Sequence, residues 1–486
     1  MSTEAGLHAD LPRLARQNTR PKAGIVHLGL GAFFRAFGAV YIEEAMAQSG
    51  GDWGIVGVSL KSPRMRDQLA PQDCVYTAVE LGQDGEKLHQ VESVVAIMVA
   101  QEDPEAVIAA MAAADTRIVS LTITEKGYCH DPATGRLNRE HPEIKADLVS
   151  ELPLSAPGFL VRALQRRKAA GLPPFTVLTC DNLPENGRLV KSIVLDFARL
   201  LDPELADWIE TRGRFPATMV DRIVPATKPE DIDDLAARTG QFDAAPVLHE
   251  PFRQWVIEDD FVPDYGAGAR PDLAVAGVEL VEDVTAYEHM KLRMLNGTHS
   301  SLAYLGYLAG HDTIADTVTD PVFARFVKGI WRNEIIPSFT APNGVDLQVY
   351  ADALLARFAN SAIRHRTWQI AMDGSQKLPQ RILGTMRDNL AAQRPCPGLI
   401  TALAAWMIYV SGTDLRGQPI DVRDPMAERL KDVIANAPSL SERVPALLGI
   451  REIFEPELAG RIVEPVTSAH SRLMENGVIA TLEDMA

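Results

Sequence analysis

The sequence predicts an α/β amino-terminal domain followed by a mostly α-helical carboxy-terminal domain. Up to about residue 284, short apolar runs rich in β-branched residues alternate with helical patterns, which is typical of a sheet flanked by helices. Beyond that point long helical periods dominate and strand signals become rare. We therefore expect two domains, residues 1–284 and 285–486, and the length of 486 residues favours the same division.

Composition and charge exclude several classes of protein. The net charge of −17 argues against nucleic acids and anionic membrane surfaces as partners. No stretch approaches the ~18 continuous apolar residues of a membrane span, and the amino terminus lacks the apolar segment of a signal peptide. The four cysteines show no short paired spacing, so we expect neither a disulfide framework nor a zinc site. These features predict a soluble, cytoplasmic protein without a metal site or a membrane contact, and no obligate protein partner is evident.

The first strand, turn and helix predict nucleotide binding. An apolar run at residues 24–30 leads into Gly29 and Gly31, and a helical pattern follows as far as Gly50. This order supplies the first two glycines of the Rossmann dinucleotide fingerprint, although Phe34 stands where the third glycine is usual. The cofactor-binding residues predicted at this turn are Gly29, Gly31, Ala32, Phe33 and Phe34.

Two later strands bear on the cofactor. The strand expected at residues 54–60 is followed by Lys61 and Arg64 instead of the acidic residue that usually holds the ribose of NAD, which leaves NADP open beside NAD. The strand expected at residues 117–124 runs into Glu125. Ligands of such sheets bind beyond the carboxyl ends of the strands, so Glu125 is a candidate for the nicotinamide end of the cleft.

Two further polar residues follow or interrupt apolar runs in the same half. Asn186 comes shortly after the strand expected at residues 175–180, again at a carboxyl end. Asp221 lies inside the apolar run 216–224, and a buried aspartate must be paired or hydrogen-bonded. Pairing with Arg222 or a capping role would explain Asp221 as well as a functional role would.

The helix expected at residues 285–309 carries the strongest chemical signal. It places Lys291, Asn296 and His299 at i, i+5 and i+8 in an otherwise apolar pattern. At about 100° per residue, Asn296 lies roughly 140° round from Lys291, and eight residues rise about 12 Å. This spread is too large for the three side chains to converge on one atom of a substrate along a straight helix. Either Gly297 bends the helix, or the substrate is long enough to be held at several carbons. A solvated lysine and a core-edge histidine are the structural alternative.

These groups suit hydride transfer between a carbinol and a nicotinamide. A lysine whose pKa is lowered by burial can act as a general base, and an asparagine amide can donate to a developing alkoxide. Zinc performs this work in some dehydrogenases, but the sequence offers no Cys/His set for it. The basic stretch 364–381 further suggests an anionic or polyhydroxy ligand, with a solvated loop as its alternative.

The pattern of Lys291, Asn296 and His299 resembles the signature of the mannitol dehydrogenase family of polyol-specific long-chain dehydrogenases. Further segments that carry the resemblance are GLGAFFRAF (29–37), TITEKGY (122–128), CDNLPENG (180–187), MVDRIVP (219–225), EPFRQWVIED (250–259) and DGSQKLP (373–379). The resemblance implies a zinc-independent, NAD(P)-dependent oxidoreductase with a Rossmann-type amino-terminal domain. It also implies that Lys291 is the general acid/base and that Asn296 and Asn186 contact the oxyanion. His299, Asp221 and Lys377 would position the substrate.

Within the family, the strings HRTWQIAMDGSQKLPQR, EPFRQWVIED and KLRMLNG most resemble members that interconvert D-fructuronate and D-mannonate with NAD. A uronate carries a carboxylate that a polyol lacks, so its pocket should hold an additional cation. The candidates are Arg253, Arg366 and Lys377. We expect Arg253 to be the clamp, because arginine binds carboxylates in a bidentate manner.

One departure from the family pattern leaves alternatives open. The family's turn usually reads GxGAFHRAH, whereas Phe34 and Phe37 replace both histidines here. A polyol dehydrogenase acting on D-mannitol and D-fructose, or on arabinitol, is therefore an alternative. A nucleotide-binding sensor without turnover is a remote alternative, which the intact set of Lys291, Asn296 and His299 argues against.

Overall fold

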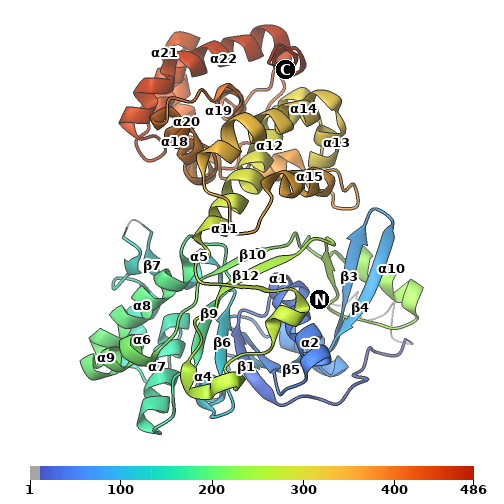
Figure 1. Ribbon diagram of the computed structural model, residues 1–486, viewed down its shortest axis with the longest axis vertical. Coiled ribbons are helices and arrows are strands. Elements are labelled where there is room, and N and C mark those ends of the chain that lie inside the picture. Colours follow the sequence, from blue (N-terminus) through green and yellow to red (C-terminus); the bar gives the residue numbers. More distant parts are fainter. Residues whose placement is uncertain (1–10, 133, 486) are drawn as a thin grey trace. The chain divides into compact units, whose positions relative to one another are not determined.

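The computed structural model describes residues 11–132 and 134–485, which form two compact units (Figure 1). The amino-terminal unit ends at Val284 and the carboxy-terminal unit begins at Thr285. In Figure 1 the first runs from blue to light green and the second from yellow to red. No helix among the described residues is long and apolar enough to cross a membrane.

A parallel five-stranded sheet forms the centre of the amino-terminal unit. Its strand order is β5-β2-β1-β6-β9, so the chain fills one side of β1 and then crosses to the other. This reversal makes the carboxyl ends of β1 and β6 the switch point, where ligands of such sheets bind. The predicted fold class is confirmed. The strands are β1 (Ala23–Leu28), β2 (Gly54–Ser59), β5 (Val94–Val99), β6 (Ile118–Leu121) and β9 (Thr176–Thr179).

Three smaller sheets extend the unit. Their strands are β10 (Thr218–Asp221), β12 (Gln254–Glu258) and β13 (Glu279–Val281), then β11 (Val247–His249), β3 (Tyr76–Gly82) and β4 (Gly85–Val91), and the hairpin β7 (His130–Asp131) and β8 (Arg136–Leu137). The α-helices are α1 (Ala32–Ala36), α2 (Gly38–Ser49), α3 (Arg64–Leu69), α4 (Pro104–Ala112), α5 (Thr124–Gly127), α6 (Pro142–Val149), α7 (Ala156–Ala169), α8 (Asn186–Leu201), α9 (Pro203–Arg212) and α10 (Pro229–Thr239). Short 3-10 helices cover Ala70–Gln72, Pro263–Gly268 and Leu273–Ala276.

Apolar residues on both faces of the parallel sheet build two cores. One core joins the sheet to α4, α7, α8 and α9, and the other joins it to α1, α2 and β12. Because both faces are covered, the strands are buried almost along their whole length, which explains their continuous apolar runs.

The described part of the carboxy-terminal unit is helical. Helix α19 is buried along nearly its whole length and packs against α12 and α22. The α-helices of this unit are α11 (Thr285–Met290), α12 (Thr298–Ala309), α13 (Ile314–Thr319), α14 (Pro321–Ile330), α15 (Leu347–Phe358), α16 (Thr367–Ala371), α17 (Gly374–Leu378), α18 (Gly384–Ala391), α19 (Pro397–Tyr409), α20 (Ala427–Ala435), α21 (Leu440–Leu448) and α22 (Pro456–Glu483). Three π-helical segments, η4 (Lys291–Gly297), η5 (Trp331–Ile335) and η7 (Pro379–Leu383), and the 3-10 turn η6 (Ile336–Ser338) connect some of them.

Candidate active site

The glycine turn after β1 leaves its main chain accessible to a ligand. Gly29 has φ +94°, and a Cβ atom there would lie 2.1 Å from the carbonyl oxygen of Thr122. Gly31, which precedes α1, is exposed, and a Cβ there would meet no atom nearer than 3.8 Å. The turn therefore leaves open main chain at the switch point of the sheet. This open main chain fits the pyrophosphate of a dinucleotide, the group that such turns bind.

The phenylalanines of this turn belong mainly to the core. Phe34 is buried and stacks on His27 with ring centroids 3.3 Å apart. Phe37 is fully buried and contacts Tyr41 and Trp255. The ring of Phe34 is enclosed by protein, which leaves its main chain for a cofactor contact, so its predicted cofactor role stays a prediction. Ala32 and Phe33 are half-buried at the start of α1 and stay predictions.

Asp181 holds the loop that follows β6. It accepts hydrogen bonds from the backbone N–H groups of Ile123 and Thr124, at 2.8 and 2.9 Å, and from the Tyr128 hydroxyl at 2.8 Å. These bonds support Thr124 in a left-handed conformation with φ +63°. Burial raises the pKa of Asp181. Glu125 is exposed on α5, next to this fixed loop.

Asn186 joins the ends of two strands. Its side-chain amide donates to the carbonyl oxygens of Asp181 at 3.0 Å and Thr218 at 2.9 Å, and its Oδ1 accepts from the Thr218 N–H. Glu185, immediately before it, has φ +46°. Both amide hydrogens are thus committed to the main chain. In this conformation Asn186 has none to donate to the oxyanion of a substrate.

Asp221 and Arg253 lie on neighbouring strands, β10 and the approach to β12. Asp221 is buried and pairs in register with Gln254. Arg253 forms a bidentate ion pair with Glu44 of α2, with one N–O distance of 2.9 Å, and stacks 4.2 Å above the Tyr41 ring. The role of Arg253 as a substrate clamp stays a prediction, and its guanidinium holds a carboxylate of the protein in this structure. It connects α2 to the second sheet.

The helix that carries Lys291 changes its winding at that residue. The segment Lys291–Gly297 is π-helical, with α-helix before and after it. A π-helix bonds residue i to i+5 and holds more residues in each turn, so it reduces the angle between Asn296 and Lys291 below the roughly 140° of an α-helix. Lys291 is buried and Asn296 is half-buried. The wide turn therefore gathers the predicted base and the predicted amide donor on one face.

Gly297 does not bend this helix, contrary to one of the two expectations above. Its backbone is regular, with φ −63° and ψ −46°. A Cβ atom there would lie 2.6 Å from the carbonyl oxygen of Arg381 on η7. The glycine is required because η7 approaches the helix that carries Lys291 at this point.

His299 lies in a buried group of rings. Its ring centroid is 4.8 Å from that of His365 and 5.3 Å from that of Phe358. Nε2 of His299 and Nδ1 of His365 are buried and have no hydrogen-bond partner among the described residues. Burial lowers the pKa of His365 to about 4 and that of His299 well below its usual value, with nearby cationic groups adding to both shifts. Both imidazoles are therefore neutral at pH 7.

The DGSQKLP segment positions Lys377. Asp373 has φ +56° and precedes α17, and Ser375 is bonded to the Asp424 carboxylate through its N–H at 2.8 Å. Lys377 donates to the Met372 carbonyl at 2.7 Å. Its Nζ lies 3.8 Å from the Asp373 carboxylate. Burial, with the nearby Arg381 charge, lowers the pKa of Lys377.

Arg381 is the functional candidate that the sequence analysis missed. It lies on η7, one turn beyond Lys377, and donates to Ser300 Oγ at 3.2 Å. Burial lowers its pKa. Arg366, by contrast, is exposed at the start of α16. The i, i+4 spacing of Lys377 and Arg381 in the string KLPQR was the available signal.

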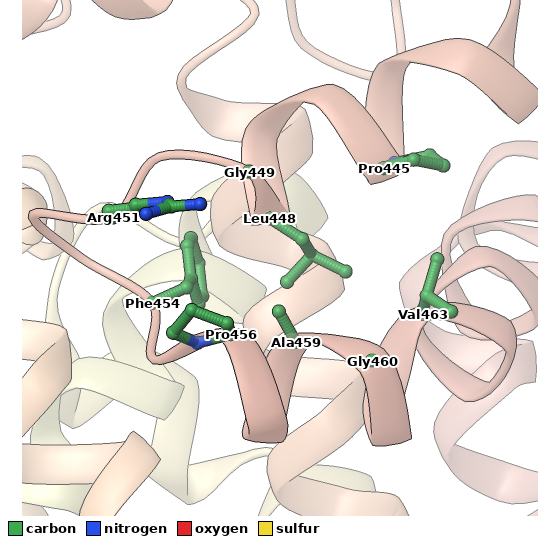
Figure 2. A pocket seen from close by; sticks show the side chains of 9 residues that line it. All are labelled: Pro445, Leu448, Gly449, Arg451, Phe454, Pro456, Ala459, Gly460 and Val463. Carbon is green, nitrogen blue, oxygen red and sulfur yellow. The ribbon is translucent and has the colours of Figure 1, made fainter.

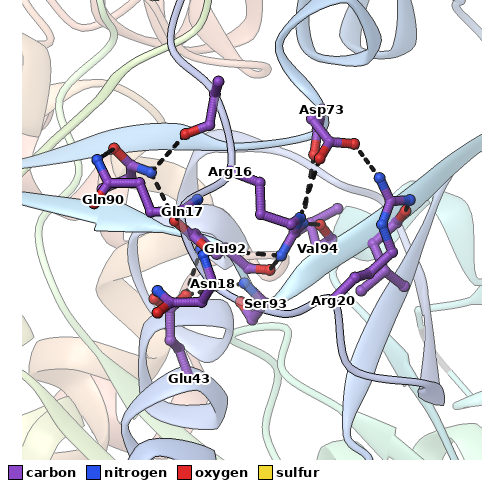
Figure 3. A network of polar contacts seen from close by, with 12 residues as sticks. Arg16, Gln17, Asn18, Arg20, Glu43, Asp73, Gln90, Glu92, Ser93 and Val94 are labelled. Atoms are coloured by element: carbon purple, nitrogen blue, oxygen red, sulfur yellow. Dashed lines mark hydrogen bonds and ion pairs between the residues drawn. The ribbon is translucent and has the colours of Figure 1, made fainter.

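Two cavities lie apart from these residues. One of about 380 Å³ separates α21 from α22 (Figure 2). Another, of about 370 Å³, adjoins a polar network in which Arg16 lies between Asp73 and Glu92 (Figure 3). None of the predicted site residues lines either cavity.

Comparisons with known proteins identify the class of protein. The model of the mannitol dehydrogenase Rossmann domain matches residues 23–265, and that of the mannitol dehydrogenase C-terminal domain matches residues 283–474. The chain is 46% identical to the uncharacterized oxidoreductase YeiQ of Escherichia coli (strain K12), over 97% of this chain and 96% of that protein. It is 44% identical to D-mannonate oxidoreductase of the same strain, over 98% of each.

A solved structure agrees with these matches. The Pseudomonas fluorescens mannitol 2-dehydrogenase, solved as a ternary complex with NAD and D-mannitol, is 36% identical and superimposes with a TM-score of 0.83 over 98% of this chain and 97% of that one. The protein is therefore an oxidoreductase that acts on CH–OH groups. More particularly, the chain belongs to the mannitol dehydrogenase family, as the sequence motifs predicted.

Proposed function

We propose that the protein interconverts D-fructuronate and D-mannonate with NAD, without zinc, and that Lys291 is its general acid/base. The observation that supports the sugar-acid substrate is a cluster in the carboxy-terminal unit, in which the neutral imidazoles of His299 and His365 lie near the cationic side chains of Lys377 and Arg381. Two of its imidazole nitrogens are buried without a partner among the described residues, which costs free energy unless a ligand supplies one. A substrate carboxylate offers acceptors for an imidazole N–H, an ammonium and a guanidinium together.

The neutral state of the imidazoles fits this substrate. At pH 7 each ring has one N–H donor, which the carboxylate can accept. The permanent charge that attracts the anion then comes from Arg381, which stays protonated in proteins. Arg381 thus replaces Arg253 as the cation that a uronate pocket requires.

Lys291 and Asn296 provide the chemistry at the reacting carbon. In the oxidative direction the hydroxyl proton of the substrate passes to Nζ of Lys291, while the carbinol carbon loses its hydrogen as hydride. Bound NAD supplies the acceptor for that hydride. Asn296 donates an amide hydrogen to the oxygen as negative charge develops on it. In this proposal Asn186 acts by fixing the ends of β9 and β10, and Asp221 and His299 position the sugar hydroxyls.

Oxidation of a polyol is the second candidate, because the P. fluorescens relative is solved with D-mannitol. Initial rates of NADH oxidation with D-fructuronate and with D-fructose distinguish the two. We expect the uronate to be preferred, and Arg381→Met to lower kcat/KM for it by ~100-fold while changing the rate with fructose by less than ~5-fold. Lys328→Met, an exposed lysine of α14, is the control and should change neither.

The other possible results of these rate measurements would change the proposed function. Preference for fructose in the wild type would assign the protein to the polyol dehydrogenases. Equal loss of both activities in Arg381→Met would give that residue a structural role, which the melting temperature would report. NADH binding without turnover of either ketose would contradict the reductase function and favour a sensor. Repeating the assay with NADPH measures the cofactor preference.

A further inference from the structure

The hairpin β7–β8 brings three metal-ligating side chains of the amino-terminal unit together. Cys129 directly precedes β7, His141 directly precedes α6, and Glu143 lies in the first turn of that helix. One ligand atom from each residue lies within 4.8 Å of the other two. We propose that Cys129, His141 and Glu143 bind a divalent transition-metal ion, with Zn²⁺ as the best fit.

The backbone of the hairpin fixes this proximity. The N–H of Asn138 donates to the carbonyl of Cys129 at 2.9 Å, and the N–H of His141 donates to the carbonyl of Asn138 at 3.1 Å. These bonds close the chain on itself, so Cys129 and His141 become neighbours although they are well separated in the sequence. A search for short paired cysteine spacings does not find such a set, which is why the sequence predicted no metal site.

The spacing of the donors is close to what a zinc site requires. Zinc binds thiolate sulfur at ~2.3 Å and nitrogen or oxygen at ~2.1 Å, so neighbouring ligand atoms are about 3.5 Å apart. Sγ of Cys129 lies 3.9 Å from Oε2 of Glu143. In this proposal the ligand atoms move inward from at most 4.8 Å to about 3.5 Å when the ion binds. Three protein ligands leave the fourth position for water.

A buried ring nitrogen of His141 without a hydrogen-bond partner argues that this group does more than hold the hairpin together. A weak S–H···O hydrogen bond accounts for the pair of Cys129 and Glu143 without an ion. That hydrogen bond does not involve His141, whose Nδ1 is buried and has no hydrogen-bond partner in the described chain. A set of one thiolate, one imidazole and one carboxylate is typical of borderline-soft ions such as Zn²⁺ and Co²⁺, not of Mg²⁺ or Ca²⁺.

A cation already occupies part of this position. Nζ of Lys61 lies 3.3 Å from Oε1 of Glu143, and the Lys61 side chain is 73% exposed. Such an exposed ion pair contributes little and is readily broken. Asp147 adds negative charge near Cys129, but its own carboxylate accepts hydrogen bonds from Leu154 and Ser155. A divalent ion would therefore replace Lys61, and Asp147 would stay in place.

The test is a titration of the full-length, tag-free protein with Co²⁺. A tetrahedral site with a thiolate ligand gives an intense sulfur-to-cobalt absorption band in the near ultraviolet. We expect this band at one equivalent, its loss on addition of Zn²⁺, and its absence in Cys129→Ser. Cys396→Ser, which removes another buried free cysteine, should keep it.

Two further variants make the result decisive. His141→Gln should weaken Co²⁺ binding at least ~10-fold while the Cys129 thiol stays present. Lys61→Gln should tighten binding several-fold, because it removes the competing ammonium. The proposal is overturned if the wild type gives no thiolate band, or if the band survives in Cys129→Ser. Circular dichroism of each variant separates loss of the site from loss of folding.

Discussion

The two units build their candidate sites in different ways. In the amino-terminal unit the main chain forms the site, through the open turn at Gly31 and a left-handed residue held by Asp181. In the carboxy-terminal unit side chains form it, on and beside a helix that changes from α to π winding. The first site is suited to a cofactor whose phosphates bind backbone N–H groups, and the second to a substrate that needs charges and proton transfer.

The polar side chains of the two sites also differ in how fully their hydrogen bonds are satisfied within the protein. Asn186 and Arg253, both predicted to contact substrate, are fully engaged within the amino-terminal unit. His299 and His365 in the other unit each leave a buried nitrogen without a partner among the described residues. Because a buried polar atom without a partner costs free energy, these two nitrogens, which lie beside Lys377 and Arg381, make this group a candidate for ligand binding. A side chain at a strand end whose hydrogen bonds are all made within the protein, such as that of Asn186, holds the strands in place.

The largest expected effect is at Lys291. Lys291→Ala should lower kcat/KM by about 10²–10⁴-fold at neutral pH, because proton transfer to a positioned base is lost. NADH affinity should stay within about twofold of the wild type, since the cofactor site is attributed to the other unit. Steady-state rates and fluorescence titration with NADH measure both. A variant that keeps more than about a third of the activity would remove Lys291 from the mechanism.

The turn in the amino-terminal unit can be broken by one methyl group. Gly29→Ala should weaken NADH binding at least ~10-fold, because its Cβ would collide with the Thr122 carbonyl 2.1 Å away. Gly277→Ala is the matched control, since Gly277 has φ +89° but open space around it. Equal loss of NADH affinity in both variants would show that backbone strain, not the collision, is responsible.

The corresponding test in the carboxy-terminal unit is Gly297→Ala. Its Cβ would meet the Arg381 carbonyl at 2.6 Å, so we expect a loss of about 1–3 kcal/mol of stability and a lower kcat. Gly329→Ala, in α14 with no atom within 4 Å, should instead be neutral or stabilising. Denaturant unfolding compares the two. A neutral Gly297→Ala would contradict the close packing of η7.

Two carboxylates, one in each unit, should respond to pH alike: half-buried Glu43 and buried Glu334. Glu43 accepts the N–H groups of Glu92 and Ser93, and Glu334 accepts those of Gly398 and Leu399. Burial raises the pKa of each to about 7. A folded-state pKa above the unfolded one gives stability that is present below pH ~4.5 and is lost as the pH rises through about 7.

The expected size of this effect is about 2–3 kcal/mol for each carboxylate at most. Glu43→Gln and Glu334→Gln should each flatten the fall in stability between about pH 5 and pH 8. Urea unfolding at the two pH values measures it. The groups that face Glu43 are Arg16, His89 and Glu92, so a variant with an unchanged pH profile would mean that these charges offset its burial.

The smallest effect is expected at Arg253. Arg253→Ala should cost about 1 kcal/mol of stability, because its ion pair with Glu44 is partly exposed. The ratio of uronate to polyol turnover should not change. Rates with both ketoses and a melting curve give the two quantities. A selective loss of uronate turnover would restore the clamp role that its contacts argue against.

Several features could be predicted from the sequence because they depend on local order. The continuous apolar runs indicated strands covered on both faces, and the two glycines after the first strand indicated the nucleotide turn. The polar residues of the helix at 285–309 identified the catalytic candidates. Periodicity and turn chemistry are properties of neighbouring residues, so one chain is sufficient to read them.

Other features depended on residues distant in the chain. Phe34 was placed in the cofactor site by its position in a motif, whereas packing on His27 puts it in the core. Arg253 looked like a free cation until Glu44, 209 residues away, proved to be its partner. The meeting of Cys129 with His141 and Glu143 required the hairpin to close.

The sequence by itself determined the α/β and helical halves and the family, and it singled out Lys291, Asn296 and His299 as the catalytic candidates. Only the tertiary structure decided that this helix widens to π winding, which reduces the angle between Lys291 and Asn296. Only it decided that Gly297 gives room to the neighbouring segment η7 and does not bend the helix. The physical reason is that winding and side-chain availability are set by packing and by hydrogen-bond partners. Those partners come from segments that the sequence does not place beside one another.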